Sequence, residues 1–159
     1  MDFKLISVGI ADYKIATSPD ILRTILGSCV GVCCYDSERK IAGLAHIMLP
    51  SKNARGTNDK KYADSAIPLL VRDMEKAGAG RDTIRAKIMG GASMFKLNSN
   101  GLMSEIGINN VNKVKAVLTD LNIAIIAEDT GGDYGRTIDF YSADGMVKVK
   151  SIGREVKML

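Results

Sequence analysis

Two apolar runs flank one short polar stretch, and this pattern constrains the fold more than any other feature of the sequence. The runs are Val30–Tyr35 and Ile41–Leu49, and the polar residues between them are Asp36–Lys40. Short apolar runs bounded by turn residues are typical of buried strands, and so short a connection joins neighbouring antiparallel strands. The sequence therefore predicts a β-hairpin over residues 30–48.

The register of this hairpin decides whether two reactive side chains meet. If the loop is Asp36–Arg39, Tyr35 faces Lys40 and Cys29 faces His46, the only histidine of the chain. Directly opposed side chains have Cβ atoms about 5 Å apart, so the thiol and the imidazole can share a proton. If all the polar residues belong to the loop, the two side chains are offset by one and point to opposite faces, unless a bulge intervenes. The sequence leaves both registers open.

A bend just before the hairpin carries a possible nucleophile. Gly27 and Ser28 are small residues that allow a sharp turn, and Cys29 follows at once between apolar neighbours. Free backbone N–H groups at such a bend, here those of Ser28 and Cys29, are what an oxyanion hole requires. The alternative is that Cys29 only packs in the core, because free cysteine is among the most buried residue types.

The rest of the chain alternates between strand and helix patterns. Apolar spacing predicts one helix from Tyr62 to a cap at Gly78, with a kink or a start near Pro68, and another over 111–121, capped by Asn109 or Asn110. Further strands are predicted at 3–10, 21–25, 83–89, 123–127, 136–142, 146–152 and 156–159. About eight strands and two helices indicate an α/β (α+β) fold with mixed β-sheets in layers, and no linker divides residues 1–159 into more than one domain.

The composition of the chain argues against several classes of protein function. The 159 residues contain 46% hydrophobic and 25% charged residues, with no apolar run of about 18 residues that would span a membrane. The N-terminus does not resemble a secretory signal, so we expect a cytoplasmic protein with its three cysteines reduced. The net charge of +4 is spread along the chain and aromatic residues are few, which argues against nucleic-acid binding and suits an acidic protein partner.

Two glycine-rich segments resemble ligand loops only superficially. Gly90–Ser93 lacks the Gly-Lys-Ser/Thr ending of a phosphate-binding loop, and Glu128–Asp133 lacks the spaced ligands and closing glutamate of a calcium loop. One histidine and neighbouring cysteines do not assemble four tetrahedral zinc ligands. We therefore expect no metal and no cofactor.

The polar residues near the hairpin are the minimum for thiol-based acyl transfer. His46 would take the proton of the Cys29 thiol, and Thr24 is available to fix the orientation of the imidazole ring. The alternative for His46 is a core histidine whose hydrogen bonds are satisfied. The residues alone do not separate these interpretations.

Five short sequence blocks occur in order along the chain: 26–30 (LGSCV), 45–50 (AHIMLP), 61–64 (KYAD), 90–95 (GGASMF) and 127–132 (AEDTGG). Together they resemble the CheD family of chemoreceptor glutamine deamidases of bacterial and archaeal chemotaxis. The resemblance implies a catalytic triad of Cys29, His46 and Thr24. It also implies a fold similar to the deamidase domain of cytotoxic necrotizing factor toxins, the cytoplasmic helical bundle of chemoreceptors as substrate, and the CheC phosphatase as a partner.

The chain departs from the family pattern at two places. In some members the threonine stands six residues before the cysteine, whereas Arg23 occupies that position here and Thr24 stands five residues before Cys29. We interpret this as a one-residue deletion at the bend. The family's Ile-Gly-x-Arg-Asn pattern appears as residues 106–110 with Asn109 in place of the arginine.

The predicted reaction is attack of the Cys29 thiolate on a glutamine carboxamide, release of ammonia and hydrolysis of a thioester. The alternative, from a different functional class, is a chemotaxis adaptor that binds receptors and CheC without catalysis. A bend that presents Cys29 fits a binding pocket as well as a catalytic one.

Overall fold

The computed structural model describes residues 2–94 and 105–159. Ten strands and two helices lie within these ranges. From the sequence we also expect a loop at 98–101, which falls outside them. In chain order they are β1 (Leu5–Ser7), β2 (Tyr13–Thr17), β3 (Ile21–Leu26), β4 (Val30–Asp36), β5 (Ile41–Ile47), α1 (Ala63–Lys76), β6 (Ile84–Gly90), α2 (Ile106–Asp120), β7 (Ile125–Thr130), β8 (Arg136–Tyr141), β9 (Val147–Lys150) and β10 (Lys157–Met158).

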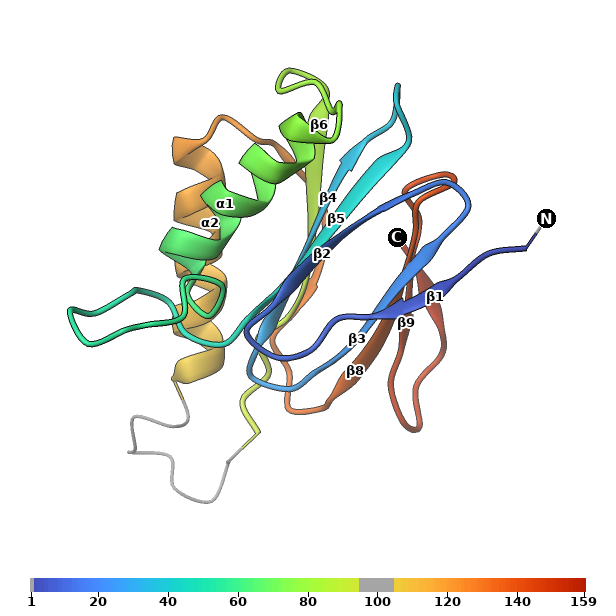
Figure 1. Ribbon diagram of the computed structural model, residues 1–159. Coiled ribbons are helices and arrows are strands. Elements are labelled where there is room, and N and C mark those ends of the chain that lie inside the picture. The colour runs from blue at the N-terminus through green and yellow to red at the C-terminus, as the bar shows by residue number, and fades with distance from the viewer. Residues whose placement is uncertain (1, 95–104) are drawn as a thin grey trace.

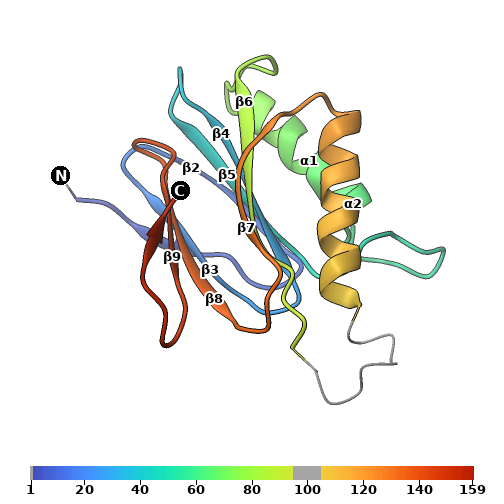
Figure 2. The same ribbon diagram turned by 180° about the vertical axis from the view of Figure 1, so that it is seen from behind.

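The elements form three layers, two sheets and a pair of helices (Figure 1). The outer sheet has the order β1-β3-β8-β9-β10, and the central sheet has the order β2-β5-β4-β6-β7. Helices α1 and α2 cover one face of the central sheet, and the outer sheet packs against its other face, as Figure 2 shows from behind. Parallel pairs (β1 with β3, β6 with β7) occur beside antiparallel ones. The predicted α+β class with mixed sheets and two main helices is thus confirmed.

Two apolar clusters hold the layers together. One lies between the helices and the central sheet and includes Ile67, Leu70 and Val114. The other lies between the two sheets and includes Leu22, Leu44 and Phe140. Neighbouring residues of β4 divide between the clusters, since Cys33 belongs to the second and Cys34 to the first, as the alternation of side chains along a strand requires.

The N-terminal strand is shorter than predicted. Only Leu5–Ser7 pairs with β3, and a strand that the sequence analysis did not predict, β2, follows in the other sheet. The chain changes sheets over 8–12, where Ala11 has a φ of 59°. A run that alternates like one strand is therefore divided, because its last residues form a turn that takes the chain to β5.

The strand predicted at 123–127 is also displaced. It spans Ile125–Thr130 and is an edge strand, and 59% of the Ile126 side chain is exposed. The apolar residues that suggested a fully buried strand are shared with the preceding turn, where Ile123 is buried.

The first helix follows its prediction closely. Helix α1 begins at Ala63, runs through Pro68 and ends with Ala77 as C-cap. Gly78 comes directly after the cap with a φ of 109°, the left-handed conformation in which glycine commonly ends a helix. No described helix has both the length and the apolar character that crossing a membrane requires.

The hairpin forms, but in neither of the two predicted registers. Asp36 pairs with Ile41, so the loop is 37–40, and His46 pairs with Gly31 instead of Cys29. The loop is shifted by one residue because the buried Asp36 carboxylate accepts hydrogen bonds from the Glu38, Arg39 and Gly80 N–H groups. Asp36 therefore ends the strand instead of starting the loop.

Candidate active site

The candidate site lies where the chain passes from the outer to the central sheet. Strand β3 ends at Leu26, β4 begins at Val30, and the bend 27–29 joins them. A Cβ atom at Gly31 would meet Leu26 and Ile138 of the outer sheet, so the face of the central sheet that carries Gly31 and its partner His46 looks toward the outer sheet. The site is therefore built between the two sheets.

Thr24 and His46 meet across this interface. The Thr24 Oγ1 atom of β3 lies 2.7 Å from the His46 Nδ1 atom of β5. Both residues are buried, with 4% and 2% of their surface exposed. This contact is the one that the sequence analysis expected of Thr24.

The hydroxyl of Thr24 fixes the tautomer of His46. Thr24 Oγ1 donates its single proton to the Val8 carbonyl, at 2.7 Å, so it can only accept a hydrogen bond from the imidazole. Nδ1 of His46 must then carry a proton, and in the neutral ring Nε2 has the free lone pair. Nε2 is the nitrogen that remains to take a proton from a thiol.

Cys29 lies on the same side of the central sheet but is not hydrogen-bonded to the histidine. It is half-buried and packs against the apolar cluster between the sheets. It precedes Gly31, the pairing partner of His46, by two residues, so the two side chains are diagonal neighbours instead of directly opposed. In the described chain Thr24 and His46 are joined and Cys29 is near but unbonded, which is common in active sites without substrate.

Burial favours the uncharged forms of both reactive groups. It raises the pKa of the Cys29 thiol and lowers the pKa of His46 to about 4. A thiol and a neutral imidazole are thus the resting state at neutral pH, in contrast to the thiolate and imidazolium pair considered from the sequence. His46 would remove the proton as the sulfur attacks.

Arg23 stands six residues before Cys29, where some family members have the threonine. Its side chain faces away from the histidine. Its guanidinium forms two hydrogen bonds with the Asp139 carboxylate, at 2.5 Å and 2.8 Å. Side chains alternate along β3, so Thr24 points between the sheets while Arg23 points outward. The geometry therefore supports assigning the family's threonine to Thr24.

The glycine pair at the end of β6, Gly90 and Gly91, holds the bend in place. Gly91 N–H donates to the Cys29 carbonyl at 2.9 Å, and Ala92 N–H donates to the Gly27 carbonyl at 3.0 Å. Gly90 has a φ of 105°, and a Cβ atom there would lie 2.3 Å from the Cys29 carbonyl oxygen. Because these amides already have acceptors, the segment supports the backbone of the bend instead of forming a phosphate cradle.

Asn110 lies on α2 and links the bend to the residue after the end of β5 through hydrogen bonds. Its Nδ2 group donates to the Ser28 carbonyl at 3.1 Å and to the Met48 carbonyl at 3.0 Å. The sequence pattern predicts that this residue or Asn109 caps the helix, but α2 begins at Ile106 with Glu105 as its N-cap. The partners of Asn110 are 82 and 62 residues away in the sequence, so no local pattern revealed its role.

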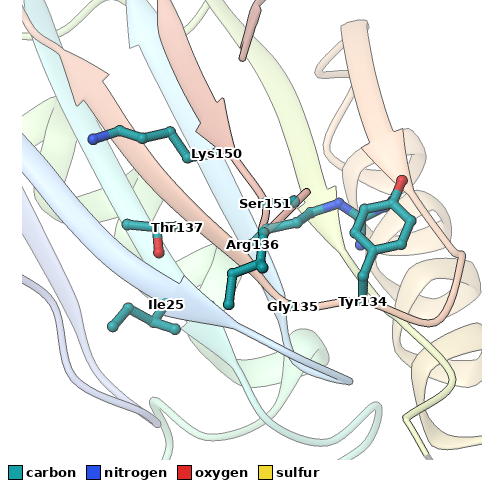
Figure 3. Close-up of a pocket in the computed structure, with 8 residues that line it drawn as sticks. Ile25, Tyr134, Gly135, Arg136, Thr137, Lys150 and Ser151 are labelled. Carbon is teal, nitrogen blue, oxygen red and sulfur yellow. The ribbon is translucent and has the colours of Figure 1, made fainter. Parts of the chain in front are cut away.

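Two surface cavities adjoin the site. A depression of about 370 Å³ is lined by Thr24 and His46 together with Ile10, Arg23 and Ile25. A second, of about 410 Å³, contains none of the predicted site residues and is lined by Ile25, Thr137 and Lys150 among others (Figure 3). Ile25, with 71% of its surface exposed, borders both cavities.

The described residues offer no metal centre. Over 2–94 and 105–159, no group of three or more His, Cys, Asp or Glu side chains could hold an ion. In the acidic segment at 128–133, the Asp129 carboxylate is paired with Arg136 at 3.2 Å and Lys157 at 3.0 Å. It therefore serves as an ion-pair partner instead of a calcium ligand.

Fold and site together define an α+β protein in which a buried histidine–threonine pair, bridged across two sheets, stands beside a cysteine-bearing bend. Residues 48–151 match the family model described as CheD chemotactic sensory transduction. The chain belongs to the CheD family. The matched segment begins after Thr24, Cys29 and His46, so the family model does not cover these three residues.

Curated relatives align with the whole chain. A protein of Caldanaerobacter subterraneus subsp. tengcongensis, named probable chemoreceptor glutamine deamidase CheD, is 49% identical over 162 residues and covers 100% of both chains. A protein of Clostridium novyi with the same name is 46% identical over 157 residues, covering 97% of each chain. The solved structure of the hypothetical protein YfiH of Bacillus licheniformis has a TM-score of 0.51 and 17% identity, over 75% of this chain and 50% of that one. This last similarity concerns the fold alone.

Proposed function

We propose that this protein converts glutamine side chains of chemoreceptors to glutamate, with Cys29 as nucleophile. The observation that carries the proposal is the Thr24–His46 contact of 2.7 Å beside the Cys29 bend. It leaves one imidazole nitrogen free to accept a proton in a buried site. The relatives named probable chemoreceptor glutamine deamidase support the substrate class.

The reaction begins with attack of the Cys29 sulfur on the carboxamide carbon. As the C–S bond forms, His46 Nε2 takes the thiol proton and the carbonyl oxygen becomes an oxyanion, held by backbone N–H groups of Ser28 and Cys29. When the C–N bond breaks, the imidazolium returns that proton to the departing nitrogen. Ammonia leaves and a thioester remains.

Water completes the cycle. His46 takes a proton from the attacking water, the C–S bond breaks, and the proton returns to the Cys29 sulfur, leaving a glutamate side chain on the receptor. Thr24 holds the imidazole in the same orientation through both halves. A neutral glutamine thereby becomes a negative charge on the receptor's helical surface, where it changes repulsion between side chains one turn apart.

We further propose that the surface around the bend receives protein partners, the receptor and the CheC phosphatase. Large apolar side chains are exposed there: Ile10, Ile25, Met48, Met94 and Ile152. Ile25 and Ile10 border the depression beside His46, and Met94 lies against Gly27. Exposed apolar groups around a reactive centre are typical of protein docking surfaces.

The decisive experiment compares wild-type protein with Cys29→Ala on a receptor cytoplasmic fragment. We expect ammonia release and the mass increase of an amide-to-acid conversion with wild type, and neither with the variant. Cys33→Ala is the matched control, because that thiol is buried between the sheets away from the bend. Equal ammonia release by wild type and Cys29→Ala would refute the catalytic proposal.

The adaptor alternative is tested with the same variants. If Cys29→Ala still binds CheC and the receptor fragment in a pull-down but releases no ammonia, docking and chemistry are separate properties of one surface. A wild-type protein that binds both partners yet releases no ammonia would favour the adaptor function.

A further inference from the structure

Asn110 contributes the only side-chain amide that links the Cys29 bend to the segment after His46 within the described chain. It is fully buried. One Nδ2 proton goes to the Ser28 carbonyl and the other to the Met48 carbonyl, so both donors of the amide are used. A single side chain thus fixes the backbone before the nucleophile relative to the backbone that follows the base.

The hydrogen bond from Asn110 to the Ser28 carbonyl also orients the N–H group of Cys29. The Ser28 C=O and the Cys29 N–H belong to one planar peptide group, and in a trans peptide these two bonds point in opposite directions. Asn110 draws the carbonyl inward, toward α2. The Cys29 N–H is therefore directed outward, away from the helix layer.

The backbone around Cys29 is fixed on both sides. The Cys29 carbonyl is held by Gly91 N–H at 2.9 Å, and the Ser28 carbonyl is held by Asn110 at 3.1 Å. No described residue accepts a hydrogen bond from the Cys29 N–H itself. A donor that is immobilised and has no acceptor among the described residues is what stabilisation of a developing oxyanion requires.

Asn110 carries a cost to stability. Its Oδ1 atom is buried and has no hydrogen-bond partner among the described residues. A buried acceptor without a partner is destabilising, and leucine, which has the same branched arrangement of side-chain heavy atoms, would avoid that penalty. The position is therefore better explained by the two donated hydrogen bonds than by packing.

We infer that Asn110 is a positioning residue that orients the Cys29 N–H toward the oxyanion formed when the thiol attacks a carboxamide. The inference rests on the proposed deamidase function and adds to it a residue in the second helix. Asn110 touches neither substrate nor sulfur in this scheme. It acts through the Ser28–Cys29 peptide group.

The test compares Asn110→Leu and Asn110→Asp with wild type in the intact protein. Loss of a single oxyanion donor typically lowers kcat by about 10²–10³-fold, so loss of its orientation is expected to lower kcat on a receptor fragment by roughly 10–100-fold. KM should change less than about twofold, because ground-state binding does not use the oxyanion contact. Asn109→Leu, at the exposed neighbouring position, is the matched control and should leave both constants unchanged.

Alkylation of Cys29 by iodoacetamide separates orientation from general damage. This reaction needs the thiol but no oxyanion hole, so its rate should be the same in wild type and both Asn110 variants. A parallel fall of alkylation and kcat, or an unchanged kcat in a folded variant, would overturn the inference. If Asn110→Leu does not fold, Asn110→Asp carries the comparison, because it keeps the side-chain shape and loses the Nδ2 donors.

A third measurement does not depend on activity. The Cys29 amide proton, followed by NMR, should shift between wild type and the Asn110 variants because its peptide group is released. An unchanged amide resonance would overturn the inference even if wild type proved inactive. An inactive wild type with a shifted resonance would instead refute the deamidase proposal, and only the orientation of the Cys29 peptide group by Asn110 would stand.

Discussion

The hydroxyl of Thr24 and the imidazole of His46 are 2.7 Å apart although they belong to different sheets. The Thr24 hydroxyl donates its only proton to the Val8 carbonyl. Its oxygen therefore accepts a hydrogen bond from the Nδ1–H group of the ring. A carboxylate usually performs this task in catalytic triads. Here a neutral hydroxyl, itself oriented by a backbone carbonyl, contacts the buried imidazole at the corresponding position.

Replacing Thr24 tests that relationship. Thr24→Val keeps the side-chain volume but removes the acceptor for Nδ1–H, so we expect kcat to fall by roughly 100-fold or more, within the range attributed to general acid–base catalysis. Thr24→Ser retains the hydroxyl and should keep activity within about tenfold of wild type. Steady-state ammonia release measures both. Equal rates for the valine and serine variants would show that the hydroxyl does not orient the base.

The three thiols should differ in reactivity. Cys29 is half-buried whereas Cys33 and Cys34 are buried, so iodoacetamide should label Cys29 first. Because burial raises the pKa of the Cys29 thiol, labelling should be slow at neutral pH and accelerate as the pH rises beyond the ordinary thiol range. Peptide mapping by mass spectrometry over a pH series measures the rate. Fast labelling that is already maximal at pH 7 would contradict the neutral resting state.

Stability should depend on His46 in mildly acidic solution. Its pKa falls from 6.5 to about 4 on burial, so between these values the unfolded chain binds a proton that the native protein does not. The free energy of unfolding should therefore decrease as the pH falls from 6.5 to 4, by on the order of 3 kcal/mol from this group.

Urea unfolding between pH 7 and pH 4 checks this dependence, with His46→Gln as reference. The chain has a single histidine, so the variant removes the whole contribution of imidazole titration. Identical pH profiles for the two proteins would refute the assignment.

Two glycines with positive φ provide a matched test of the contact between the end of β6 and the Cys29 bend. Gly131→Ala, with a φ of 84° and no described atom within 4 Å of the added Cβ, should show only backbone strain, about 1–3 kcal/mol. Gly90→Ala adds a clash at 2.3 Å with the Cys29 carbonyl and should cost roughly 1–3 kcal/mol more. It should also reduce deamidation in the fraction that folds. Chemical unfolding and ammonia release measure the two effects, and equal values for both variants would show that the contact is unimportant.

Local sequence patterns were sufficient to predict that the hairpin forms, but they did not predict which residues of its two strands pair. The apolar runs around Asp36–Lys40 identify two strands, but both predicted registers placed Asp36 in the loop. Its burial depends on the Gly80 N–H, 44 residues further along the chain, which no turn rule anticipates. A shift of one residue was enough to make Cys29 a diagonal neighbour of His46.

Long-range contacts also explain what the sequence analysis missed. Strand β2 was not predicted because its neighbour is β5, with Tyr13 opposite Ala45, and its own residues alternate only weakly. Asn110 was assigned a capping role from its place near a helix start, whereas its partners lie on two other segments. Thr24 could be chosen over Arg23 from the family pattern, but only the opposite orientations of the two side chains supply the physical reason.

Because the site is divided between two sheets, its geometry depends on how closely the two sheets pack against each other. Thr24 is held by the outer sheet and His46 by the central sheet, so a small separation of the layers breaks their contact while every strand remains paired within its own sheet. Activity should therefore disappear at lower urea concentration than β-sheet circular dichroism. Our proposed site therefore makes catalytic competence a property of the closed packing between the layers and not of either layer alone.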